Sequence, residues 1–76
     1  MLDIEKFGLR LAQLRHRANL TQREVAEICS VSVQAVSKWE RGKACPDLLL
    51  LDDLARILGV ELQELFDQTT TEEDVF

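Results

Sequence analysis

Residues 21–42 read TQREVAEICSVSVQAVSKWERG and contain two short helical patterns joined by a turn of about three residues. Thr21 followed by Glu24 has the form of a capping box, which predicts the start of a helix that continues to about Cys29. Ser32 has the position of an N-cap for the second helix, and Gly42 marks its end. The residues that this spacing turns inward are Val25, Ala26, Cys29, Val36 and Trp39. The segment therefore predicts two capped helices in close succession.

A longer helix is predicted before this segment, from about Ile4 to Ala18. Apolar residues recur there at helical spacing, namely Phe7, Leu11, Leu14 and Ala18. Asn19 tolerates the left-handed backbone conformation that ends helices. Gly8 lies inside the helix, where glycine costs about 1 kcal/mol relative to alanine. We therefore expect a neighbouring backbone segment to approach Gly8 closely.

Two further helices are predicted after Gly42. Asp47 has the position of an N-cap, and Gly59 ends the helix that follows it. The residues of that helix expected to face the core are Leu48, Leu51, Leu54, Ala55 and Leu58. A short fifth helix covers roughly Leu62–Asp67, and residues 69–76 have the composition of a loose acidic tail. The prediction is an all-α fold, a compact five-helix domain over residues 1–68.

Composition narrows the class of protein. The 76 residues are enough for one small domain and too few for most enzyme architectures. The chain has one histidine, no glycine-rich phosphate loop and no paired carboxylates in a credible pocket, so the groups of a catalytic site are missing and we expect no enzyme activity and no cofactor. Cys29 and Cys45 are too far apart for a zinc pair, so no metal site is expected. The apolar run Leu48–Leu51 is far shorter than the ~20 residues of a membrane helix, and we expect a cytoplasmic protein.

Charge is divided unevenly along the chain. The net charge is −5, which taken alone argues against a nucleic-acid partner. Residues 6–43, however, hold eight Lys or Arg and three acids, whereas residues 44–76 hold one Arg and nine acids. Binding responds to the local field of a surface rather than to the total charge. The basic half can meet phosphates while the acidic half faces elsewhere.

The two helices of residues 21–42 have the lengths and the turn of a helix-turn-helix, whose second helix can enter the major groove of DNA. The run from Ser37 to Gly42, SKWERG, is the most specific part of the pattern. With the glycine and leucines of the first helix and the pattern from Pro46 to Val60, the chain resembles the phage Cro/repressor-type (lambda-repressor-like) helix-turn-helix family. It departs from that family at Ser30, where the turn usually has glycine because the position is left-handed.

The resemblance implies roles for individual residues. Gln22 matches the glutamine that binds a DNA phosphate and braces the second helix of the motif. The positions that reach base edges are Val33, Gln34 and Lys38, and those that commonly touch the DNA backbone are Ser37, Arg41 and Lys43. Arg15 and Glu40 match an internal salt bridge between the first and third helices.

Helical geometry agrees with part of this assignment. If Val36 points inward, then Gln34, Lys38 and Arg41 fall on the opposite side, within ~60° of one another. A glutamine there can pair with both N6 and N7 of adenine, and a lysine can donate to O6 or N7 of guanine.

The leading interpretation is a sequence-specific DNA-binding transcriptional regulator, a repressor, that acts as a homodimer on a two-fold operator. No small-molecule site is evident. Apolar residues of the acidic half form the expected dimer interface, and they are Leu49, Leu50, Leu62 and Phe66. The alternative is a protein-interaction module, such as an anti-repressor, that retains the same fold. Its weakness is that such a module has no need of the glutamines and cations gathered on one surface.

Overall fold

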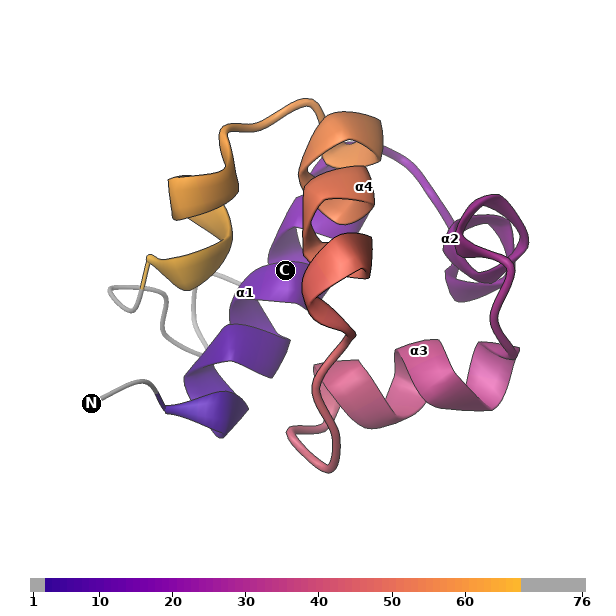
Figure 1. Ribbon diagram of the computed structural model, residues 1–76, viewed down its shortest axis with the longest axis horizontal. Helices are drawn as coiled ribbons and strands as arrows, with labels where there is room; N and C mark the ends of the chain where they lie inside the picture. Colours follow the sequence, from indigo (N-terminus) through magenta and orange to yellow (C-terminus); the bar gives the residue numbers. More distant parts are fainter. Residues whose placement is uncertain (1–2, 68–76) are drawn as a thin grey trace.

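The computed structural model describes residues 3–67, and every regular element in that range is helical (Figure 1). In chain order, the elements are α1 (Ile4–Arg17), α2 (Gln22–Cys29), α3 (Val33–Glu40), α4 (Leu48–Leu58) and the 3₁₀ helix η1 (Leu62–Phe66). The predicted all-α fold with five helical segments is confirmed, although the fifth is a 3₁₀ helix. The acidic tail expected over residues 69–76 lies outside the described residues.

Local capping chemistry sets the ends of α2 and α3. The Glu24 N–H donates to Thr21 Oγ1 at 3.0 Å, and the Thr21 N–H donates to Glu24 Oε1 at 2.9 Å, so the capping box is confirmed. Ser32 Oγ accepts from the Ala35 N–H at 3.1 Å at the start of α3. Ser30 has φ 57° and ψ 44°, the left-handed conformation predicted for the turn. A serine there replaces the usual glycine at a cost of about 1 kcal/mol.

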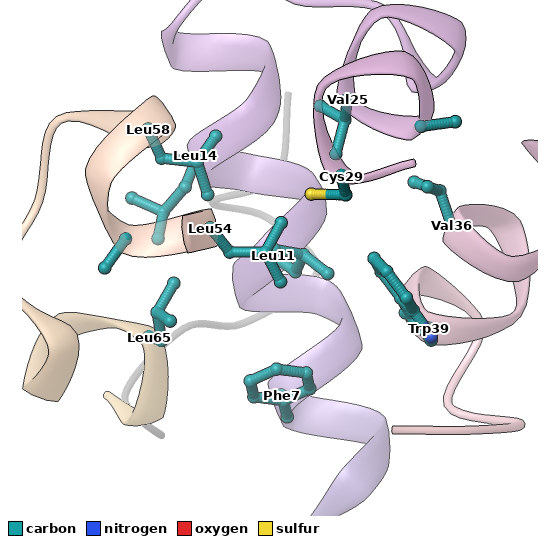
Figure 2. Close-up of a cluster of buried hydrophobic side chains, with 12 residues drawn as sticks. Phe7, Leu11, Leu14, Val25, Cys29, Val36, Trp39, Leu54, Leu58 and Leu65 are labelled. Atoms are coloured by element: carbon teal, nitrogen blue, oxygen red, sulfur yellow. The ribbon is translucent and has the colours of Figure 1, made fainter. Parts of the chain in front are cut away.

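Helix α1 passes through the middle of the domain and supplies the centre of the core. Figure 2 shows Leu54, Leu58 and Leu65 on one side of α1, and Val25, Cys29, Val36 and Trp39 of α2 and α3 on the other side. These four residues of α2 and α3 and Ala26 are buried, and all five were predicted to face inward. Burial, together with the nearby carboxylate of Asp53, raises the pKa of the Cys29 thiol, which keeps this core side chain neutral.

The close approach predicted at Gly8 is present, and it joins α1 to the end of α3. A Cβ placed on Gly8 would lie 2.5 Å from the carbonyl oxygen of Trp39 and 2.6 Å from that of Glu40. Both neighbours are backbone atoms, which cannot swing away as a side chain does. Gly8 therefore fixes how closely α3 lies against α1.

The start of α4 differs from the prediction. Leu48 was expected to face the core but is 81% exposed, and Leu49 is 82% exposed, so the covered part of α4 begins only after its first two residues. Leu51 is half-buried against the core, and Leu54 is fully buried. Asp47 precedes α4 but makes no side-chain capping bond. Helical spacing predicts which residues share one face of α4, but it does not show which of them the neighbouring segments cover.

Arg10, one of the eight cations of residues 6–43, is buried rather than part of the basic surface. The residue is 9% exposed, and its Nε donates to the Glu64 carbonyl oxygen at 2.9 Å. One terminal nitrogen donates to Gln13 Oε1 at 2.8 Å, and the other lies 4.0 Å from a carboxylate oxygen of Asp67. Arg10 thus ties η1, a short 3₁₀ helix with poor hydrogen-bond geometry of its own, to α1.

Candidate nucleic-acid interface

Helices α2 and α3 lie at one end of the molecule, and η1 lies at the other (Figure 1). The two helices are joined by residues 30–32 and are held together by their buried faces. Helix α3 turns Val36 and Trp39 inward, at 0% and 4% exposure. The opposite face of α3 is exposed to solvent, so this helix could contact the major groove of DNA.

The predicted base-reading residues lie on or beside this outer face. Gln34 and Lys38 are exposed, whereas Val33 is half-buried and packs against the core. No ion pair or side-chain hydrogen bond occupies Gln34 or Lys38 within residues 3–67. Gln34 and Lys38 therefore have hydrogen-bonding groups available for base edges. Val33 can contribute only the exposed part of its methyl groups.

The predicted phosphate-contacting residues flank the same helix. Arg41 and Lys43 are exposed just beyond the end of α3, and Ser37 is half-buried. Arg41 folds back so that its Nε donates to Ser37 Oγ at 3.2 Å and to the Ser37 carbonyl oxygen at 3.3 Å. The terminal nitrogens of Arg41 remain available. Gln22 lies on the first turn of α2, where the leading backbone N–H groups lack intrahelical partners and favour an anion.

Arg15, Glu40 and Gln22 form a hydrogen-bonded cluster that joins α1, α3 and α2. Arg15 Nε donates to Glu40 Oε2 at 2.6 Å, and another guanidinium nitrogen donates to Oε1 at 3.1 Å. The two side chains are 11% and 7% exposed, so this is a buried ion pair. Arg15 also donates to the Leu20 carbonyl oxygen at 2.9 Å, and Gln22 Nε2 donates to Glu40 Oε1 at 3.0 Å. The resemblance implied the ion pair and a bracing role for Gln22, but it did not name Glu40 as the residue that Gln22 contacts.

Two of the cations in the basic half form bonds inside the domain, so the basic surface is smaller than the sequence suggests. Arg10 and Arg15 are engaged inside the fold and do not belong to the basic surface. The exposed cations left in residues 6–43 are Lys6, Arg17, Arg23, Lys38, Arg41 and Lys43. None of these six makes an ion pair within the part of the chain that the structure describes. They are therefore the cations of the described residues that can attract a polyanion such as DNA.

The residues predicted to form a dimer interface are not equally accessible. Leu49 is 82% exposed and Leu62 is 46% exposed. Leu50 and Phe66 are half-buried against the core, and the Phe66 ring stacks on Phe7 with centroids 5.8 Å apart. Leu49 and Leu62 are therefore available to a partner, whereas much of Phe66 is used inside the protomer.

An all-helical domain that presents the exposed face of α3 from a capped α2–turn–α3 unit has the architecture of the helix-turn-helix proteins. A family model described as helix-turn-helix matches residues 11–65. The chain belongs to this family, which confirms the resemblance that its sequence indicates. No helix within residues 3–67 is long and apolar enough to cross a membrane.

Known proteins resemble the chain over most of its length. It is 42% identical over 60 residues to the HTH-type transcriptional activator BcrR of Enterococcus faecalis, covering 79% of this chain but only 29% of BcrR. It is 40% identical over 76 residues to the HTH-type transcriptional regulator y4dJ of Sinorhizobium fredii, covering 99% of this chain and 96% of y4dJ. The crystal structure of the restriction-modification controller protein C.AhdI from Aeromonas hydrophila superposes with a TM-score of 0.78 at 35% identity, covering 87% of this chain and all of that one.

Proposed function

We propose that the chain is a sequence-specific DNA-binding transcriptional regulator that inserts α3 into the major groove. The observation that carries the proposal is the division of α3 into two faces. Val36 and Trp39 anchor the helix in the core, and Gln34 and Lys38 lie on its solvent face without side-chain partners among the described residues. These are side chains that discriminate base pairs in the major groove. Similarity to proteins named as transcriptional regulators supports the same function.

Repression is the direction of regulation that we propose, with action in the cytoplasm and no catalytic activity. Occupying an operator that overlaps a promoter blocks transcription and needs only the DNA-binding surface described above. BcrR, by contrast, is named as an activator, and the chain spans less than a third of its length. A promoter-reporter assay distinguishes the two directions, because repression lowers reporter output when the chain is expressed and activation raises it.

Binding to duplex DNA is expected to depend strongly on salt. If each protomer neutralises about four or five phosphates with its exposed cations, the logarithm of the binding constant of a dimer falls against the logarithm of the salt concentration with a slope near −7 to −9. This slope is measured by fluorescence anisotropy with a labelled duplex, at salt concentrations from about 50 to about 300 mM. A flat titration, or no binding at the lowest salt, would favour the protein-interaction module over a DNA-binding regulator.

We also propose that two copies assemble through α4 and η1, with Leu49 and Leu62 in the interface. In Figure 1, η1 lies at the opposite end of the molecule from α2 and α3, and α4 lies between them, so a two-fold axis on the η1 side leaves both copies of α3 exposed. Half-sites one helical turn apart require each α3 to lie about 17 Å from the axis, which is half of ~34 Å. That distance fits a domain whose longest extent is 28 Å.

Two protomers are therefore expected on one palindromic duplex. The interface is small, so assembly in the absence of DNA should appear only at high protein concentration. Sedimentation of the chain with and without the duplex measures the stoichiometry. Leu49→Ser is expected to weaken assembly on DNA without changing the free energy of unfolding, because Leu49 is largely exposed. One protomer per duplex at every concentration would refute the dimer.

A further inference from the structure

The side-chain amide of Gln22 is hydrogen-bonded to another side chain of the domain and is not free in solvent. Its Nε2 lies 3.0 Å from Glu40 Oε1, across the junction between α2 and α3. Gln22 is half-buried, and the carboxylate of Glu40 is 7% exposed. The residue expected to contact phosphate is therefore in contact with a buried negative charge.

That contact fixes the direction of the amide. An ionised carboxylate can only accept hydrogen bonds, so Gln22 must present its NH₂ group to Glu40 and not its carbonyl oxygen. The NH₂ group has two N–H donors, and Glu40 takes one of them. The second donor has no hydrogen-bond partner within residues 3–67, and an N–H donor is the group that a phosphate oxygen requires. A bond to a charged acceptor also holds the amide more firmly than a neutral one would.

The same carboxylate would repel DNA if its charge were not balanced. Arg15 supplies the balance, because two of its nitrogens donate to the two oxygens of Glu40 at 2.6 and 3.1 Å. The pair is close to neutral when viewed from a phosphate several ångströms away. Glu40 can therefore orient Gln22 without introducing a net negative charge beside the binding surface.

We propose that Glu40 is a positioning residue for phosphate recognition: it fixes the Gln22 amide so that one N–H is held inside the domain and the other faces the DNA backbone. The proposal rests on the proposed DNA-binding function and adds to it a residue that does not itself touch DNA. It also gives the buried ion pair a role in binding that is separate from its role in the fold.

A double-mutant comparison on DNA tests the proposal. The background variant carries both Arg15→Met and Glu40→Met, which removes the acceptor without leaving either charge buried and alone. In the wild-type chain, Gln22→Met should weaken binding to a duplex selected in vitro about tenfold, as expected for a lost hydrogen bond to a charged group. In the background variant, the same substitution should cost about twofold or less, because the amide there is no longer oriented.

Lys43→Met is the matched control, because no side-chain hydrogen bond or ion pair within residues 3–67 joins Lys43 to the cluster, and it should cost the same factor in both backgrounds. A wild-type chain that binds no duplex overturns the proposed function and this proposal with it. A chain that binds, but in which Gln22→Met costs the same factor in both backgrounds, overturns the role of Glu40 alone.

A measurement on the wild-type chain keeps the proposal testable even if the background variant fails to fold. Nuclear magnetic resonance resolves the two Nε2 protons of Gln22. On addition of the selected duplex, one proton should shift as it bonds to phosphate while the other, held by Glu40, stays close to its position in the free protein. Shifts of both protons, or of neither, would contradict the arrangement.

Discussion

Gly8→Ala is expected to lower the free energy of unfolding by about 3 kcal/mol, at the upper end of the range for overpacking substitutions. The new Cβ would meet the carbonyl oxygens of Trp39 and Glu40 at 2.5 and 2.6 Å, and both atoms belong to the backbone. Helix α3 would have to move away from α1, which opens the core around Trp39. The ~1 kcal/mol that alanine gains over glycine inside a helix offsets only part of this cost.

Urea unfolding followed by tryptophan fluorescence measures the effect of Gly8→Ala. Gly59→Ala is the matched control, because a Cβ there meets nothing within 4 Å, although its φ of 71° is strained for alanine. The control should lose about 1–2 kcal/mol from backbone strain alone. A Gly8→Ala variant as stable as the wild-type chain would show that α1 and α3 are not in the close contact described here.

Arg15→Met is expected to cost about 3 kcal/mol of stability, because it leaves the buried carboxylate of Glu40 without its cation. The lost interactions are the two bonds to Glu40 and the bond to the carbonyl oxygen of Leu20. In a domain of this size, whose total stability is about 4–11 kcal/mol, such a loss unfolds a measurable fraction of the molecules near body temperature.

Replacing both partners is the control for Arg15→Met. The double variant Arg15→Met, Glu40→Met removes the charges together, so it should be more stable than either single variant. Chemical unfolding of the four proteins gives the coupling energy between Arg15 and Glu40. A coupling energy of zero would mean that the two side chains merely share a surface.

The parts of the fold that depend on neighbouring residues could be predicted from the sequence. Thr21 and Glu24 form their capping box within four residues, and Ser32 caps α3 in the same way. The inward faces of α2 and α3 follow from helical spacing alone. Gly8 was predicted to mark a close approach because glycine is costly in a helix, although the identity of the approaching segment was not predictable.

Features that depend on distant segments were not predictable. Leu48 continues the apolar spacing of α4, but nothing in that spacing shows that the neighbouring segments leave it exposed. Arg10 resembles any other cation in the basic half, and its partner, the Glu64 carbonyl oxygen, lies 54 residues away. The bond between Gln22 and Glu40 likewise joins two helices whose angle no local pattern specifies. Within the candidate site, helical geometry predicted which residues lie on the outer face of α3. The Arg15–Glu40 pair was predicted only from the family resemblance.

The central claim is that α3 reads DNA sequence through Gln34 and Lys38. The most direct test is to select duplexes from a random pool, once with the wild-type chain and once with Gln34→Ala. The wild-type chain is expected to enrich a two-fold sequence with half-site centres about 10 base pairs apart. Gln34→Ala should lose the preference at one base pair of each half-site, at a cost of about 1–3 kcal/mol for the wild-type sequence, and keep the preferences elsewhere. Failure to enrich any sequence, or an equal loss of specific and non-specific binding in Gln34→Ala, would contradict the claim.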